Sequence, residues 1–198
     1  MTSFDSRPAS AAIAEAAEAA DAGAPPDWGV GYGSLIWDPG FDFRESGLAR
    51  VHGYHRAFCI RSTRYRGTPE RPGVVLGLDR GGSCIGMAFR LRPESRRAAV
   101  DALYEREMTG GVYVARTLSA MLVDGRRVRA LAFVANHDSP SYQRLTDDEI
   151  VERLTSCCGQ RGPNREYAVR TWRSLAEHGV HCPHLGRVGR RLLAAGCG

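Results

Sequence analysis

The sequence predicts an α+β protein in which a mixed β-sheet carries flanking helices. Strand-like segments come first, a helix and a hairpin follow, and helical patterns occupy the chain from Thr146 onward. A doubly wound α/β protein would instead alternate strands and helices along the chain. This segregated order therefore predicts one mixed sheet with helices packed against it.

The bulk composition is that of a single globular domain with a short extension. The chain has 198 residues, of which 43% are hydrophobic and 25% are charged, enough for one substantial core. Residues 1–26 are rich in alanine and small polar residues and end in Ala-Pro-Pro. Because such a segment buries little apolar surface, we expect it to be disordered, and residues 27–198 should form the domain.

The sequence favours a cytoplasmic location. No apolar run approaches the ~20 residues needed to cross a bilayer. The alanine-rich start is interrupted by Glu15, Glu18 and Asp21, which is unlike a secretory signal. We therefore expect a cytoplasmic protein with no membrane partner.

The β-rich half begins at residues 30–37, Val-Gly-Tyr-Gly-Ser-Leu-Ile-Trp, where an apolar lead-in predicts a strand that ends in a glycine loop. Arg50–Ile60 and Gly73–Leu78 have strand composition. Cys84–Leu91 alternates small or apolar residues with a period of two. These segments are predicted to pair in one sheet.

A helix is predicted over residues 93–108. Pro93 suits a first helical turn, and Val100, Leu103 and Tyr104 recur at helical spacing. The pair of glycines at 110 and 111 should end this element.

A hairpin and a helical region complete the chain. Asp124-Gly125, a dipeptide typical of tight hairpins, joins strand-like residues 112–123 to residues 127–135. Thr146 is followed by three acidic residues, as at the first turn of a helix. Two or three helices are expected from there, one of them starting after Pro163.

The net charge of +5 arises from arginine, because the chain contains no lysine. The arginines are scattered and the aromatics lie mostly in strand-like runs, so the clustered basic and aromatic face of a nucleic-acid-binding protein is missing. A mild positive field favours an anionic small-molecule substrate instead. We predict no nucleic-acid partner.

The six cysteines, at 59, 84, 157, 158, 182 and 197, have neither the density nor the spacing of a disulfide framework. They are predicted to be reduced thiols. The group His178, His181, Cys182 and His184 resembles a metal site at first sight, but it lacks a second ligand pair at zinc-finger spacing. We therefore predict no metal.

The glycine loop is open to two interpretations. Without side chains at Gly31 and Gly33, main-chain N–H groups can turn toward an anion or a developing oxyanion. A tight turn leaving a core strand would show the same pattern. Ser34 lacks the Gly-x-Ser-x-Gly surroundings of a hydrolase nucleophile, and the loop lacks the third glycine of a dinucleotide site.

Downstream segments resolve this ambiguity through a family resemblance. Together with the glycine loop, residues 103–113, Leu-Tyr-Glu-Arg-Glu-Met-Thr-Gly-Gly-Val-Tyr, resemble the ChaC-type γ-glutamylcyclotransferases. Three further segments agree with bacterial members of that family: residues 65–72, 77–83 and 162–167. The resemblance extends from about Trp28 almost to the C-terminus.

The resemblance implies a curved or barrel-like sheet, the γ-glutamylcyclotransferase-like fold. It implies an enzyme that releases 5-oxoproline from a γ-glutamyl compound, typically glutathione, with no metal or organic cofactor. A cyclotransferase for γ-glutamylamines or other γ-glutamyl peptides is the alternative enzyme. From another class, a non-catalytic module that binds γ-glutamyl groups is the other alternative.

Glu107 is the predicted catalytic residue, because it matches the family's catalytic glutamate. Helical periodicity agrees, since Glu107 follows Leu103 by four residues and Tyr104 by three, on the apolar face. Glu105 is the rival. It lies about 200° around the helix from Glu107 and should point away.

The predicted substrate-binding residues come from the loop and from two tyrosines in family-like segments. Many relatives carry an aromatic residue where this chain has Val30. The polar segment with Arg61, Arg64 and Arg66 is either a contact for the glycine carboxylate of glutathione or a solvated loop. The full predicted set is Val30, Gly31, Tyr32, Gly33, Ser34, Leu35, Tyr113 and Tyr167.

Overall fold

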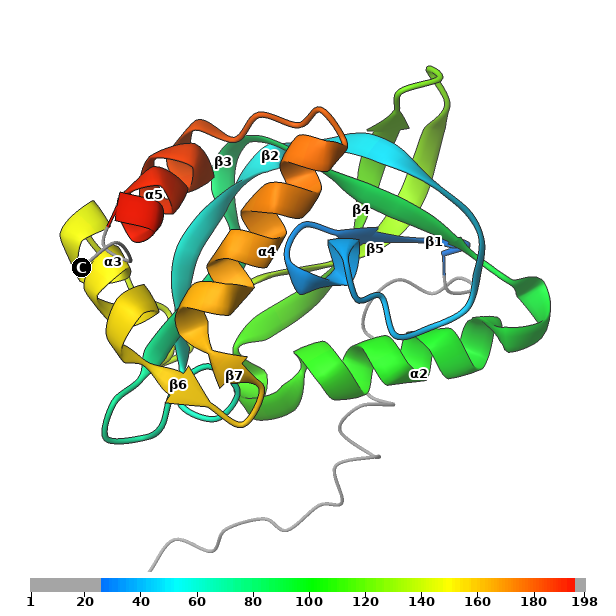
Figure 1. Ribbon diagram of the computed structural model, residues 1–198. Coiled ribbons are helices and arrows are strands. Elements are labelled where there is room, and N and C mark those ends of the chain that lie inside the picture. The colour runs from blue at the N-terminus through cyan, green and yellow to red at the C-terminus, as the bar shows by residue number, and fades with distance from the viewer. Residues whose placement is uncertain (1–25, 195–198) are drawn as a thin grey trace, which may run out of the picture.

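The computed structural model of the protein describes residues 26–194 (Figure 1). The predicted disordered extension, residues 1–26, lies outside the described residues except for its last proline. The described chain forms a closed β-barrel with helices on its outside. This architecture confirms the predicted α+β class.

Five strands close the barrel in the order β1-β3-β2-β4-β5. A parallel pairing of β1 with β5 closes it, whereas the other neighbouring pairs are antiparallel. The predicted mixed, barrel-like sheet is therefore confirmed. The strands are Trp28–Gly31 (β1), Phe43–Ser62 (β2), Gly73–Leu91 (β3), Tyr113–Leu122 (β4) and Arg127–Ala135 (β5).

The long antiparallel pair of β2 and β3 makes up much of the barrel. Its register runs from Phe43 opposite Leu91 to Ser62 opposite Gly73, with bulges that bend the pair. The strand segments predicted at 73–78 and 84–91 are two parts of β3, because Asp79, Arg80 and Ser83 pair with residues 52–55 across a register shift.

Helix α2 (Arg96–Glu107) confirms the helix predicted over residues 93–108, except that the first three of these residues form a short 3₁₀ turn, η2 (Pro93–Ser95). Another 3₁₀ turn, η3 (Thr109–Gly111), comes directly after the helix. Gly110 and Gly111 have φ values of 77° and 65°, a left-handed conformation that glycine adopts without steric penalty. The chain therefore turns sharply away from the helix shortly after its C-cap residue, Met108.

The predicted hairpin is confirmed. β4 and β5 pair antiparallel from Tyr113 opposite Ala135 to Met121 opposite Arg127. Gly125 in the connecting turn has a φ of 87°.

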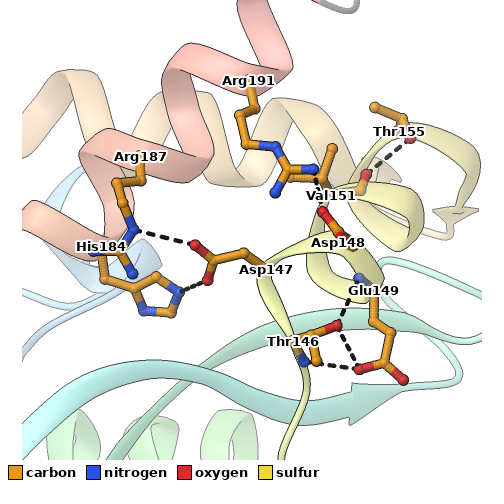
Figure 2. Close-up of polar contacts among 9 residues, drawn as sticks. All are labelled: Thr146, Asp147, Asp148, Glu149, Val151, Thr155, His184, Arg187 and Arg191. Carbon is orange, nitrogen blue, oxygen red and sulfur yellow. Dashed lines mark hydrogen bonds and ion pairs between the residues drawn. The ribbon is translucent and has the colours of Figure 1, made fainter.

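Three helices complete the fold: α3 (Asp147–Ser156), α4 (Asn164–Glu177) and α5 (Pro183–Ala194). Thr146 and Glu149 cap α3 reciprocally, the Thr146 side chain accepting from the Glu149 N–H and the Glu149 carboxylate accepting from the Thr146 N–H. Figure 2 shows this cap beside the ion pairs that join Asp147 and Asp148 to α5.

Helix α4 is tied to the barrel at its first residue. The buried Asn164 side chain accepts from the N–H of Val74 at 2.7 Å and donates to the Val74 carbonyl at 2.8 Å. A short hairpin of β6 (Cys158–Gly159) and β7 (Gly162–Pro163) leads into α4. These contacts place the start of α4 and the β6–β7 hairpin against β3 and the segment before it.

None of the helices within residues 26–194 has the length and hydrophobicity to span a membrane. In the same part of the chain, no group of three or more His, Cys, Asp or Glu side chains is arranged to hold a metal ion. His184, from the histidine cluster noted in the sequence, faces Asp147 at 3.4 Å and packs edge-on against Phe58.

Candidate active site

A cavity of about 640 Å³ opens between the end of α2, the loop after β2 and the start of α4. A smaller hollow of about 30 Å³ is continuous with it through four shared lining residues. The small hollow has room for an atom group the size of a water or a carbonyl oxygen. The shared residues are Ser34, Glu107, Tyr113 and Tyr167.

The glycine loop forms one wall of the small hollow. β1 ends at Gly31, and a 3₁₀ helix, η1, begins at Ser34 and ends at Ile36. The first N–H groups of a helix have no acceptor inside it, so those of Ser34 and Leu35 are available to a ligand. The bare backbone at Gly33 lets the Tyr167 hydroxyl approach, since a Cβ there would lie 3.1 Å from that oxygen.

Gly31 has a structural role, unlike the other residues of the loop, which line the small hollow. It pairs with Met87 in the barrel and lines neither hollow. A Cβ at this position would lie 2.7 Å from the Cβ of Leu35. Gly31 therefore permits the tight path of the loop without facing the cavity.

Glu107, the last residue of α2, lines both hollows. Leu103 and Tyr104 on the same helix are buried, and the Glu107 side chain is only 16% exposed. Glu105 is exposed to solvent and lines neither hollow. The predicted orientation of these two glutamates is confirmed.

Burial dominates the electrostatics of Glu107. It raises the pKa of this carboxyl above its ordinary value of 4.5, although the positive charges of Arg106 and Arg161 oppose the shift. A carboxyl with a raised pKa in a cavity has the properties of a general acid and base.

Arg106, the neighbour of Glu107, joins helix α2 to the glycine loop. Its guanidinium donates to the Ser34 hydroxyl at 2.9 Å and to the Asp38 carbonyl at 2.8 Å. Its Nε lies 3.5 Å from the Glu107 carboxylate. One side chain thus fixes Glu107 and the loop relative to each other.

Three buried tyrosines line the small hollow, and each has its hydroxyl bonded to the main chain. The Tyr32 hydroxyl donates to the Phe133 carbonyl, and that of Tyr113 donates to the Leu76 carbonyl, both at 2.7 Å. The Tyr167 hydroxyl accepts from the Leu76 N–H at 3.1 Å. Tyr167 therefore keeps its own proton available to a ligand.

The outer wall of the large cavity is strongly basic. Six arginines line it against three acidic residues, Asp38, Glu107 and Glu166. The polar segment around the end of β2 contributes to this wall, although Arg64 is also exposed to solvent. The arginines are Arg61, Arg64, Arg66, Arg106, Arg161 and Arg170.

The sequence that forms this site matches a known protein family. The model of the ChaC-like proteins matches residues 27–188. A glutathione-specific γ-glutamylcyclotransferase of Escherichia coli is 37% identical over 156 residues, covering 78% of this chain and 68% of the relative. The chain belongs to the ChaC-like family. The predicted family resemblance is confirmed.

Other ChaC-like relatives agree. The human glutathione-specific γ-glutamylcyclotransferase 1 is 34% identical over 148 residues, covering 72% of this chain and 67% of that protein. The crystal structure of a yeast γ-glutamylcyclotransferase specific to glutathione superposes with a TM-score of 0.78, at 21% identity, over 86% of this chain and 97% of the yeast chain. The fold is therefore that of the family.

The structure brings together Glu107 and all the predicted binding residues except Gly31. Sequence reasoning missed Arg106, Arg161 and the buried Arg56, which donates to the Tyr32 and Ile85 carbonyls. Arg106 adjoins the predicted catalytic glutamate, which was the available signal. Arg56 and Arg161 owe their positions to contacts across the fold, and nothing local in the sequence marks them.

Proposed function

We propose that this protein is a γ-glutamylcyclotransferase that converts glutathione to 5-oxoproline and Cys-Gly. The observation that carries the proposal is Glu107, a buried carboxyl of raised pKa beside the glycine loop, at the inner end of an arginine-lined cavity. The bacterial and human relatives and the yeast protein of the same fold are γ-glutamylcyclotransferases specific to glutathione, which supports glutathione as the substrate.

Ring closure needs no covalent enzyme intermediate. The α-amine nitrogen of the substrate attacks its own γ-carbonyl carbon, forming the C–N bond of 5-oxoproline, and the bond to the cysteine nitrogen breaks. Holding the two groups in a near-attack geometry accounts for up to roughly 7–11 kcal/mol in well-oriented intramolecular reactions. The residues that line the two hollows are available to hold the substrate in this geometry.

Glu107 is proposed to move the proton. The substrate amine arrives as an ammonium and must lose a proton before it attacks, and the departing cysteine nitrogen must gain one. One carboxylate performs both steps if it faces the reacting atoms. A pKa raised by burial suits both tasks, because it brings the carboxyl closer to the pH at which it works.

The glycine loop and Tyr167 are proposed to hold the γ-glutamyl head. The N–H groups of Gly33, Ser34 and Leu35 would bind its carboxylate or its carbonyl oxygen as negative charge develops there. The Tyr167 hydroxyl, whose proton is not committed to the main chain, would donate to the same group. Tyr113 and Tyr32 would shape the hollow, because their hydroxyl protons are bound to carbonyls.

We also propose that the enzyme works in the cytoplasm and without a metal or organic cofactor. A tethered nucleophile, a proton shuttle and main-chain donors together supply each step of the reaction above. The spacing of the six cysteines suits reduced thiols and hence a reducing compartment.

The test is to incubate the purified protein with reduced glutathione and to measure 5-oxoproline and Cys-Gly by mass spectrometry. Glu107→Gln should lower the turnover by about 10²–10⁴-fold, the usual contribution of a general acid–base group. Glu105→Gln, on the exposed face of the same helix, is the matched control and should turn over normally.

Other outcomes point elsewhere. Wild-type activity with γ-glutamylamines or other γ-glutamyl peptides, and none with glutathione, would keep the reaction and change the substrate. Binding of glutathione without any turnover would favour a non-catalytic binding module. Substantial activity retained by Glu107→Gln would remove Glu107 from the mechanism.

A further inference from the structure

Among the described residues, three of the six arginines that line the large cavity are not neutralised by neighbouring carboxylates. Within residues 26–194, Arg61, Arg64 and Arg161 form no ion pair with an acidic side chain; Arg61 and Arg64 donate to uncharged oxygens of Pro69 and Gln160. All three line the large cavity. Unpaired guanidinium groups on a concave surface attract an anionic group of a ligand.

Two of these arginines share one aromatic ring. The Arg161 guanidinium lies 4.4 Å from the centroid of the Tyr65 ring, and that of Arg64 lies 5.3 Å from it. Arg64 is further oriented by its Nε, which donates to the Gln160 side chain at 3.1 Å. Stacking and this hydrogen bond hold both guanidinium groups without using their remaining donors.

The main chain fixes this arrangement. The N–H groups of Gln160 and Arg161 donate to the carbonyls of Arg64 and Tyr65, both at 2.9 Å. At Gly159 the two segments are so close that a Cβ would lie 2.5 Å from the Tyr65 carbonyl carbon. The β6–β7 hairpin and the segment after β2 therefore present Arg64 and Arg161 as one prearranged unit.

The leaving portion of the substrate must extend from Glu107 along the wall of the large cavity. In the proposed reaction the γ-carbonyl lies beside Glu107, and the Cys-Gly portion that leaves is two residues long. Two extended residues span about 7 Å. Arg161 is close enough to Glu107 for its charge to lower the pKa of that carboxyl, and Arg161, Arg64 and Glu107 line the same cavity.

We propose that Arg64 and Arg161 bind the terminal carboxylate of the leaving Cys-Gly portion and make the enzyme selective for γ-glutamyl peptides that end in a free carboxylate. This inference rests on the proposed function. It assigns the recognition of the leaving group to residues other than those of the glycine loop and Glu107.

The first experiment compares two substrates that differ at one end only: glutathione and glutathione with its glycine carboxylate converted to an amide. The wild type should use the carboxylate form with a kcat/KM about 10-fold to 100-fold higher, the range for a lost charged hydrogen bond. The difference should lie mainly in KM. Equal kcat/KM values for the two substrates would overturn the proposal.

Variants then assign the selectivity to the arginines. At a pH above the acid limb of the pH–rate profile, where the loss of a charge near Glu107 has little effect on kcat, Arg161→Gln and Arg64→Gln should raise the KM for glutathione and bring the ratio of kcat/KM between the two substrates close to one. Arg173→Gln is the matched control, because Arg173 lies on the exposed surface of α4 and outside the cavity lining. A ratio that stays high in both cavity variants would overturn the assignment to Arg64 and Arg161.

Failure of the proposed function is distinguishable from failure of this inference. If the wild type does not turn over glutathione, calorimetry still measures the binding of glutathione and of its amide to the same protein. Tighter binding of the carboxylate form, lost in Arg161→Gln, would support the anion site without the reaction. Equal binding, or none of either compound, would overturn it.

Discussion

Glu107 and Asp147 are two carboxylates that face arginine side chains, yet their pKa values shift in opposite directions. At Glu107, burial raises the pKa against the charges of Arg106 and Arg161. At Asp147, a hydrogen bond from Arg187 and the nearby charge of His184 lower the pKa, and the side chain is 36% exposed. The comparison shows that an adjacent arginine does not by itself decide the protonation of a carboxyl group.

The difference follows from geometry as well as burial. The Arg187 Nε donates to the Asp147 carboxylate at 3.1 Å (Figure 2), whereas the Arg106 Nε lies 3.5 Å from Glu107 and its terminal nitrogens bind Ser34 and the Asp38 carbonyl. At Asp147, the direct hydrogen bond from Arg187 in a partly solvent-exposed position stabilises the charged carboxylate. At Glu107, the longer contact with Arg106 does not offset the desolvation of the carboxyl group.

Among the substitutions that leave Glu107 itself in place, the largest effect should come from removing Arg106. Arg106→Met deletes the bond to Ser34 and the charge nearest to Glu107, so we expect kcat/KM for glutathione to fall about 10-fold to 100-fold, as for the loss of a charged hydrogen bond. The pKa of Glu107 should rise further, and the acid limb of the pH–rate profile should move to higher pH.

Arg97→Met provides the control on the same helix, because the Arg97 side chain is 81% exposed and pairs with Asp101. Its kinetics should match the wild type. An acid limb that stays in place in Arg106→Met would show that the Arg106 charge does not act on Glu107.

The pH dependence of the wild type tests Glu107 directly. The carboxylate form must accept the proton of the substrate amine, so kcat should fall about tenfold per pH unit below its pKa. Because burial raises that pKa, the acid limb should begin above 4.5. An acid limb at or below 4.5 would contradict a desolvated Glu107.

Replacing Glu107 should raise the free energy of unfolding at neutral pH, although it lowers the activity. Since the folded pKa of Glu107 is above the unfolded value, the folded state loses stability as pH rises from 4.5 through the folded pKa. Glu107→Gln should therefore be more stable than the wild type at neutral pH. The gain is about 1.4 kcal/mol for each unit that separates the two pKa values.

Urea unfolding at pH 4 and pH 7.5 measures this effect. The stabilisation by Glu107→Gln should be present at pH 7.5 and largely absent at pH 4, whereas Glu105→Gln should change little at either pH. Equal stability of wild type and Glu107→Gln at pH 7.5 would mean that the carboxylate is well solvated in the folded protein.

Features whose causes lie within a few neighbouring residues could be predicted from the sequence, whereas features that depend on long-range contacts could not. The turns at Asp124-Gly125 and Gly110-Gly111 were predictable, because their chemistry is contained in two residues. The orientation of Glu107 was predictable from its spacing to Leu103 and Tyr104. The family resemblance, rather than periodicity, predicted the barrel, whose closure depends on the parallel pairing of β1 with β5.

The arginine wall could not be predicted in the same way. Arg64 and Arg161 are about a hundred residues apart, and they meet because Gly159 permits close contact of two main-chain segments. The continuation of β3 through residues 79–83, across a register shift, has a similar origin, since it depends on the partner strand β2. Such positions depend on contacts between distant segments of the folded chain, and a pattern of neighbouring residues in the sequence does not predict those contacts.

The smallest effect should come from Asp147. Its lowered pKa stabilises the folded state above the unfolded value near 3.8, and that contribution is lost as pH falls through the folded pKa. Because the pair with Arg187 is largely exposed, Asp147→Asn should destabilise the protein by about 0.2–1 kcal/mol at pH 7. Urea unfolding in low salt and in 1 M NaCl measures this, since salt screens exposed pairs.

Asp148→Asn is the comparison that sharpens this last prediction. Asp148 of α3 pairs with Arg191, which like Arg187 belongs to α5 (Figure 2). The Asp148 side chain is 87% exposed. Its loss should cost less than that of Asp147, because a fully hydrated pair gains little over two separate ions. Equal effects of the two substitutions would mean that the helix N-terminus, which both carboxylates share, supplies the stabilisation rather than the arginines of α5.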